Sequence, residues 1–189
     1  MILPWPVALI PYFIPMYQIM SRQAPQDPSI ERIVVCFWLY VFGIVFMVVT
    51  DAQKYLVLRE RPKGKGGLIT HSMCGWSRNM NYLGEMMLYS SFGILCQMPH
   101  IWYVFAYMWG GVFLLRMKMK DYSLSKKEGW NEYKARTWLV LPKIYNCTYL
   151  SLAVYGFVFG SAYYCYTHGG IEKGFKSVFK PGSLPSSDL

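Results

Sequence analysis

The stretch that decides the fold is IVVCFWLYVFGIVFMVVT, residues 33–50. No charged side chain interrupts it, and β-branched and aromatic residues occur throughout. At a rise of 1.5 Å per residue, a helix of about 18–20 such residues crosses the hydrocarbon core of a bilayer. We therefore expect Ile33–Thr50 to form a transmembrane helix.

The composition of the whole chain agrees with a membrane protein. Of its 189 residues, 54% are apolar and only 15% are charged, whereas about 25% are charged in an ordinary soluble protein. The net charge is +9, which could indicate a nucleic-acid partner. However, the basic residues lie beside apolar runs and do not form a separate face, so we expect membrane lipids as partners and no nucleic acid.

Further apolar runs lie on both sides of this stretch. Leu83–Met98 and Ile101–Leu115 are separated by a Met98-Pro99-His100 reversal and predict a helical hairpin (83–98/101–115). Residues 144–166 predict another span. Residues 1–20 are apolar but rich in proline, so this segment either spans the membrane with a kink or re-enters it. The fold class expected is all-α and polytopic, with about four to five membrane helices.

This organisation divides the chain into four parts. They are a Pro-rich membrane segment and linker (1–32), a membrane domain (33–143), an additional transmembrane helix (144–166) and a polar tail (167–189). The two loops expected on one side of the hairpin, 51–82 and 116–143, hold six and eight of the 19 Lys and Arg residues. By the positive-inside rule, that side is cytoplasmic or matrix-facing.

Polar residues cluster where the hairpin enters and leaves the membrane. Asn81 and Glu85 are four residues apart and share a helix face, with Arg78 near the helix start. The hairpin returns a second cluster to the same side, so together they predict a net-positive pocket for a phosphate-bearing ligand. The candidate binding residues are Asp51, Arg78, Asn81, Tyr82, Glu85, Lys120, Asp121 and Tyr133.

Metal chemistry is not expected. His71, His100 and His168 are isolated from one another, and no two of the five cysteines have CxxC spacing. Four of these cysteines lie in apolar segments, which is typical of buried small side chains. The sequence therefore predicts neither a metal site nor a disulfide framework.

Two blocks carry a family resemblance: GLITHSMCGWSRNMNYLGE (67–85) and KDYSLSKKEGWNEYKARTWLVLPK (120–143). In this order, and with a hairpin between them, residues 51–143 resemble the C-terminal reductase region of the steroid 5α-reductase-like membrane proteins. The resemblance implies that NADPH binds from the cytosolic face without a Rossmann domain. Hydride would then pass to an activated C=C bond of a sterol or other lipid.

The resemblance also implies roles for the candidate residues, although it assigns no catalytic one. Asn81, Tyr82 and Glu85 would contact the cofactor, and Arg78 and Lys120 would lie near its phosphates. Asp51, Asp121 and Tyr133 match further polar positions of that site. The alternative for these residues is structural: a helix start with Glu85 satisfied by a local cation, and a solvated interfacial pair at Lys120 and Asp121.

The sequence departs from that family in three ways. Only residues 1–20 and one clean span precede the motif, whereas relatives carry more N-terminal helices. Met80 replaces a proline, and the 144–166 span is additional. These departures favour an accessory, non-catalytic subunit of a large membrane complex, in the mitochondrial inner membrane or the endoplasmic reticulum, with other membrane subunits as partners. The alternative is an active NADPH-dependent reductase of a lipid C=C bond.

Overall fold

The computed structural model describes residues 5–23, 27–62, 67–167 and 170. Most of these residues are helical, and they include no β-strand. The chain forms two compact units, Met1–Asn146 and Cys147–Leu189. The helices are α1 (Trp5–Met20), α2 (Ile30–Glu60), α3 (Met73–Trp76), α4 (Met80–Cys96), α5 (Pro99–Tyr107), the π-helix η1 (Met108–Phe113), α6 (Leu114–Leu124), α7 (Trp130–Arg136), the 3₁₀ turn η2 (Ile144–Asn146) and α8 (Thr148–Thr167).

The apolar stretch lies inside a much longer helix. Ser29 caps α2 at its start by accepting a hydrogen bond from the Arg32 backbone N–H at 3.3 Å. The helix continues for 31 residues and ends where Arg61 turns extended ahead of Pro62. The expectation of a loop directly after Thr50 was wrong, because a change from apolar to basic side chains does not interrupt backbone hydrogen bonding. The next ten residues, through Glu60, are helical.

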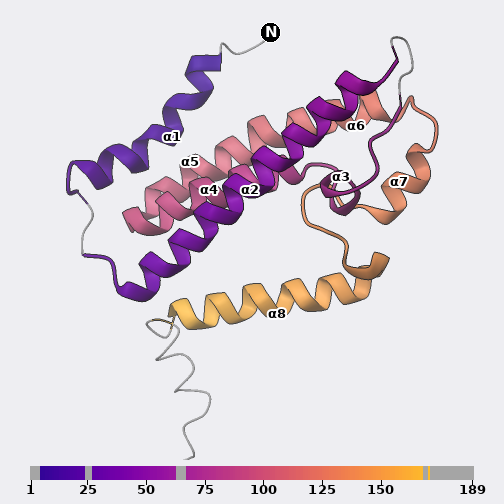
Figure 1. Ribbon diagram of the computed structural model, residues 1–189. Helices are drawn as coiled ribbons and strands as arrows, with labels where there is room; N and C mark the ends of the chain where they lie inside the picture. Colours follow the sequence, from indigo (N-terminus) through magenta and orange to yellow (C-terminus); the bar gives the residue numbers. More distant parts are fainter. Residues whose placement is uncertain (1–4, 24–26, 63–66, 168–169, 171–189) are drawn as a thin grey trace, which may run out of the picture. The chain divides into compact units, whose positions relative to one another are not determined.

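Two glycines set the contact between α2 and α4. A Cβ added at Gly84 would lie 2.5 Å from the Gly43 carbonyl oxygen and 2.6 Å from the Met47 backbone nitrogen. A Cβ at Gly43 would lie 2.7 Å from the Gly84 carbonyl oxygen. The two backbones therefore approach more closely than any side chain permits, and Figure 1 shows α2 lying along α4.

The expected reversal between the two hairpin helices is present. Gln97 takes a left-handed conformation (φ 59°) after α4, and Pro99 occupies the first turn of α5. The returning helix runs through α5, η1 and α6 as one rod (Figure 1). It ends at Leu124, not near Leu115, so Lys120 is helical and the loop expected from residue 116 was placed too early.

The core of the first unit is aromatic and sulfur-rich. Tyr12 of α1 stacks on Tyr89 of α4 with ring centroids 3.6 Å apart, and α1 is one helix despite Pro11 and Pro15 within it. The buried core cluster consists of Tyr12, Cys96, Ile101, Phe105, Met108, Phe113 and Met117. It joins α1 and α4 to the returning rod, whose last turns carry Lys120 and Asp121.

One described helix, α2, is long and apolar enough to cross a membrane by length and composition. The second unit contains α8, which has no apolar stripe: Tyr149, Leu152, Phe157 and Tyr163 are all exposed. The number of membrane spans, including the expected spans at 1–20 and 144–166, stays a prediction.

Candidate functional site

The short segment between α3 and α4 is fixed by backbone and hydroxyl contacts. Ser77 pairs with Trp138 in an isolated parallel bridge, and the Ser77 hydroxyl donates to the Val140 carbonyl at 2.6 Å. The Asn79 amide donates to the Leu139 carbonyl at 2.9 Å. Ser77 and Asn79 are fully buried. These contacts tie the start of α4 to the segment that follows α7.

We call this region, where residues 77–79 contact α6, α7 and residues 137–140, the joint. Arg78 lies at its centre and is 8% exposed. Its Nε donates to Asp121 Oδ2 of α6 at 3.1 Å, and its Nη1 donates to the Thr137 carbonyl at 2.5 Å. Its guanidinium also lies 5.8 Å from the centre of the Trp130 ring. A buried guanidinium needs such partners, because leaving its donors and charge without them would cost several kcal/mol.

Lys120 reaches the same joint from α6. Its Nζ donates to the Arg78 carbonyl at 2.7 Å and to Asn79 Oδ1 at 2.8 Å. Burial, reinforced by the positive charge of Lys54, lowers the pKa of Lys120 to about 8. The two sequence clusters on either side of the hairpin therefore meet, as the sequence predicts.

α7 contributes a hydrogen bond from a tyrosine hydroxyl to the joint. The Tyr133 hydroxyl donates to the Cys74 carbonyl of α3 at 2.7 Å, and both residues are buried. Burial raises the pKa of Tyr133 and that of the Cys74 thiol. Both groups are neutral at physiological pH, so they shape the site without adding charge to it.

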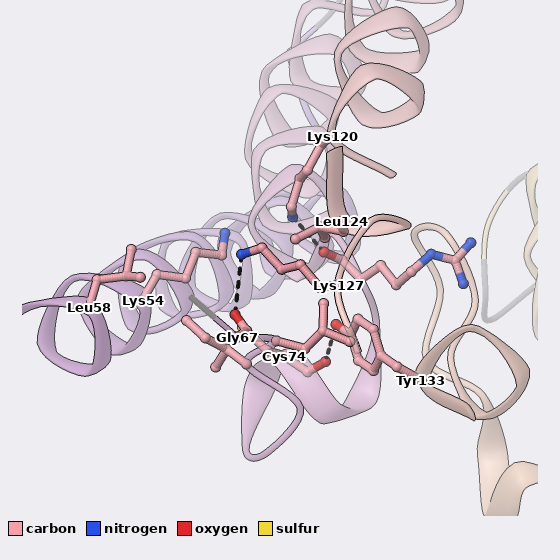
Figure 2. Close-up of a pocket in the computed structure, with 11 residues that line it drawn as sticks. Lys54, Leu58, Gly67, Cys74, Lys120, Leu124, Lys127 and Tyr133 are labelled. Atoms are coloured by element: carbon pink, nitrogen blue, oxygen red, sulfur yellow. Dashed lines mark hydrogen bonds between the residues drawn. The ribbon is translucent and has the colours of Figure 1, made fainter. Parts of the chain in front are cut away.

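A cavity of about 150 Å³ adjoins the joint (Figure 2). Figure 2 shows the amino groups of Lys54, Lys120 and Lys127 directed toward one another from α2, α6 and the turn after α6. The Lys127 Nζ donates to the Gly67 carbonyl at 3.2 Å. The lining residues are Lys54, Leu58, Gly67, Leu68, Ile69, Cys74, Arg78, Lys120, Leu124, Lys127 and Tyr133. Among the described residues, the lining thus holds four basic side chains and no acidic one.

The eight predicted site residues divide into two groups. Arg78, Lys120 and Tyr133 line the cavity, and Asp121 stands behind it as the partner of Arg78. The other four lie outside the cavity lining. Of these, Asp51 pairs with Lys54 at 3.0 Å, Tyr82 packs on Phe113 with ring centroids 4.9 Å apart, and Asn81 and Glu85 are half-buried on α4.

Sequence reasoning missed several members of the site. Cys74, Asn79 and Lys127 were not among the candidates, although all three lie within the two quoted blocks. Lys127 lines the cavity from the turn between α6 and α7, which ends at Gly129 (φ 75°). A glycine followed by a short amphipathic stretch was the available signal for that turn.

Two acceptor oxygens close to the joint have no hydrogen-bond partner among the described residues. They are Asn81 Oδ1 and Asp121 Oδ1, and both are buried. A ligand hydroxyl or amide could donate to either one. The described residues contain no group of three or more His, Cys, Asp or Glu side chains placed to hold a metal ion.

Comparison with known proteins gives one match. Residues 6–137 match the family model described as "Protein of unknown function (DUF1295)". Neither the curated proteins nor the solved structures contain a match to the chain. The matched region covers well over half of the 189 residues and includes every residue that lines the cavity. The chain therefore belongs to the DUF1295 family.

Proposed function

We propose that the chain is a non-catalytic membrane subunit of a larger complex, built on a scaffold that resembles the steroid 5α-reductase-like proteins. One observation carries the proposal: the residues that the resemblance assigns to the cofactor phosphates are already bonded within the chain. Arg78 is held by Asp121 and the Thr137 carbonyl, and Lys120 by the Arg78 carbonyl and Asn79. These side chains therefore bind other groups of the protein in the positions where the resemblance would have them bind phosphates.

The outer surface supports placement in a membrane among other subunits. Phe37, Trp38 and Phe42 lie on the apolar part of α2, and each is about half exposed. Exposed apolar surface of this extent is unfavourable in water and is typical of contact with lipid or protein. α8 presents apolar and tyrosine side chains on all sides, which suits burial among neighbouring chains as well as contact with lipid.

The second candidate function is an NADPH-dependent reductase of a lipid C=C bond. The unpaired oxygens of Asn81 and Asp121 favour it, because they could accept hydrogen bonds from a bound cofactor. The cavity fits that cofactor only in part. Its three lysines suit a phosphate group, and about 150 Å³ is less than the roughly 300–1,000 Å³ of sites that enclose a whole drug-sized ligand. Most of a dinucleotide would therefore lie outside this cavity.

The test is purification of the tagged chain in a mild detergent from the mitochondrial inner membrane and, separately, from the endoplasmic reticulum. A non-catalytic subunit is expected to migrate with partner subunits at a mass far above 22.0 kDa. It should not consume NADPH when an enone lipid is added.

Matched variants separate the two functions. Asn81→Ala removes a proposed cofactor contact on α4, and Asn131→Ala changes an exposed asparagine on α7. If NADPH is consumed by the natural chain and by Asn131→Ala but not by Asn81→Ala, the chain is a reductase and the non-catalytic proposal is wrong. A chain that migrates alone would also contradict the proposal.

A further inference from the structure

The basic side chains that line the cavity next to the joint outnumber the carboxylates that pair with them. Lys54 has a carboxylate partner in Asp51, and Arg78 has one in Asp121. Lys120 and Lys127 bond only to uncharged oxygens within the described residues. Gathering four basic side chains beside two carboxylates is costly where water is partly excluded. A bound anion would offset that cost.

The geometry favours a tetrahedral anion with several acceptor oxygens. The three amino groups come from separate segments and are directed into one space (Figure 2). A phosphate group offers one oxygen to each of them, and charge-assisted bonds of this kind are about twice as strong as neutral ones. A cavity of about 150 Å³ accommodates a phosphate group with part of its ester.

The position of the cavity along α2 indicates where that phosphate comes from. Lys54 lies four residues beyond Thr50, about 6 Å further along the helix axis. The headgroup layer extends about 5–7 Å beyond each side of the hydrocarbon core. If residues 33–50 span the core, the Lys54 side chain lies at the depth of the lipid phosphates.

The remaining lining residues suit a lipid better than a nucleotide. Leu58, Leu68, Ile69 and Leu124 place apolar side chains beside the cations. Among the described residues, Tyr133 is the only aromatic side chain of the lining, and its hydroxyl is engaged with Cys74. A phospholipid carries apolar acyl chains close to its phosphate, and these apolar side chains suit them.

We propose that this cavity binds the phosphate group of an anionic phospholipid through Lys54, Lys120 and Lys127. The inference depends on the membrane placement made in the proposed function, but not on the absence of catalysis. It names the ligand of the cavity as lipid, where the reductase alternative would name it as NADPH.

The experiment measures binding of short-chain phosphatidic acid to the full-length detergent-solubilised chain. The variants are Lys54→Gln and Lys127→Gln, which leave the joint around Arg78 intact. Each is expected to weaken binding about ten-fold or more, because each removes a charge-assisted hydrogen bond. Lys127→Arg keeps the charge and should retain most of the affinity. Thermal unfolding of each variant checks that the chain is folded.

Lys118→Gln is the control, because Lys118 is exposed on the same helix as Lys120 and lies outside the cavity. It removes the same unit of charge and should leave binding unchanged. If it weakens binding as much as Lys127→Gln does, the attraction is a general surface effect and the site is refuted. Unchanged binding in both folded cavity variants would refute it as well.

Competition separates the possible sources of the phosphate. Inorganic phosphate or NADPH that displaces the lipid at equal or lower concentration would overturn the assignment to lipid. Failure of both to do so supports it. The outcome for the proposed function is separate: a chain that binds lipid at this cavity and also reduces an enone lipid with NADPH would retain the lipid site and refute the non-catalytic role.

Discussion

Substitution of Gly84 tests whether the close contact between α2 and α4 holds the fold together. A methyl group at this position would lie 2.5 Å from the Gly43 carbonyl oxygen and 2.6 Å from the Met47 nitrogen. Ordinary contact begins at 3.4 Å, so the helices would have to separate by about 0.9 Å. Both atoms belong to the backbone and cannot rotate away.

The expected magnitude follows from two opposing effects. Overpacking that shifts the backbone costs about 2–3 kcal/mol of unfolding free energy. Replacing glycine by alanine inside a helix returns about 1 kcal/mol through helix propensity. We therefore expect Gly84→Ala to destabilise the chain by about 1–2 kcal/mol. Gly110→Ala is the matched control, since Gly110 of η1 belongs to the same unit and a Cβ there meets no atom within 4 Å, and it should be neutral or slightly stabilising.

The assay follows thermal unfolding in detergent with a thiol-reactive fluorescent maleimide. Cys36, Cys74 and Cys96 are buried and become reactive only when the first unit opens. Cys147 is exposed and Cys165 half-buried, so both are replaced by serine in every variant to lower the background. A Gly84→Ala chain that unfolds at the same temperature as the parent, or at a higher one, would show that the helices do not depend on this contact.

Three further predictions concern the joint and the cavity. Asp121→Asn leaves the buried charge of Arg78 without its carboxylate and should cost about 3 kcal/mol of unfolding free energy. The control, Asp51→Asn, breaks an exposed pair and should cost less than about 0.5 kcal/mol. Equal losses in thermal unfolding would argue against a structural role for the joint. Tyr133→Phe removes the hydrogen bond to the buried Cys74 carbonyl and should cost about 1–2 kcal/mol, against no measurable change for Tyr122→Phe on the exposed side of α6. Binding of phosphatidic acid should weaken as the pH rises through about 8, because burial, reinforced by the charge of Lys54 on α2, lowers the pKa of Lys120 to about 8, whereas Cys74 on α3, Asp121 and Asp51 favour its charged form. Lys120 is protonated below this pH and neutral above it, so binding that stays constant from pH 7 to pH 9 would exclude Lys120 from the site.

The sequence predicted the arrangement that brings the two polar clusters together. The apolar runs on either side of Pro99 are nearly equal in length, so a hairpin had to return the second cluster to the level of the first. The contact between Lys120 Nζ and the Arg78 carbonyl confirms this. A tight reversal also needs residues that end one helix and begin another, and Gln97 and Pro99 supply both conformations.

The ends of the helices could not be predicted in the same way. The apolar composition of a segment indicates which residues are stable in lipid. The length of a helix depends instead on how far its backbone hydrogen bonds continue, and these are independent of side-chain polarity. α2 therefore runs ten residues past Thr50, and α6 ends at Leu124. At about 1.5 Å per residue, α2 is about 46 Å long, which matches a bilayer including its headgroups better than the core alone.

Which residues line the cavity depends on how each helix is rotated about its axis, and the spacing of residues in the sequence does not determine that rotation. Asn81 and Glu85 share a helix face as predicted, yet neither lines the cavity. The contact between Gly84 of α4 and Gly43 of α2 sets the direction in which this face of α4 points. No sequence motif predicts that contact. Lys127 lines the cavity from the turn between α6 and α7, and a linear resemblance to a family pattern carries no information about the direction of that side chain.

The joint and the cavity share Lys120, so this residue contributes both to the packing of α6 and to the proposed anion site. The interactions of Arg78 with Asp121 and of Lys120 with Asn79 hold the α3–α4 segment against α6 and α7. Losing either would leave a buried charge or amide without its partner, whatever the ligand. These interactions therefore contribute to the fold, whereas Lys54 pairs within its own helix and Lys127 makes one hydrogen bond, to the Gly67 carbonyl. Stability should therefore follow changes at Arg78 and Asp121, and anion binding should follow changes at Lys54 and Lys127. If a folded Lys54→Gln, Lys127→Gln double variant lost the host complex instead of the lipid, the cavity would be a subunit contact and the separation of the two roles would be wrong.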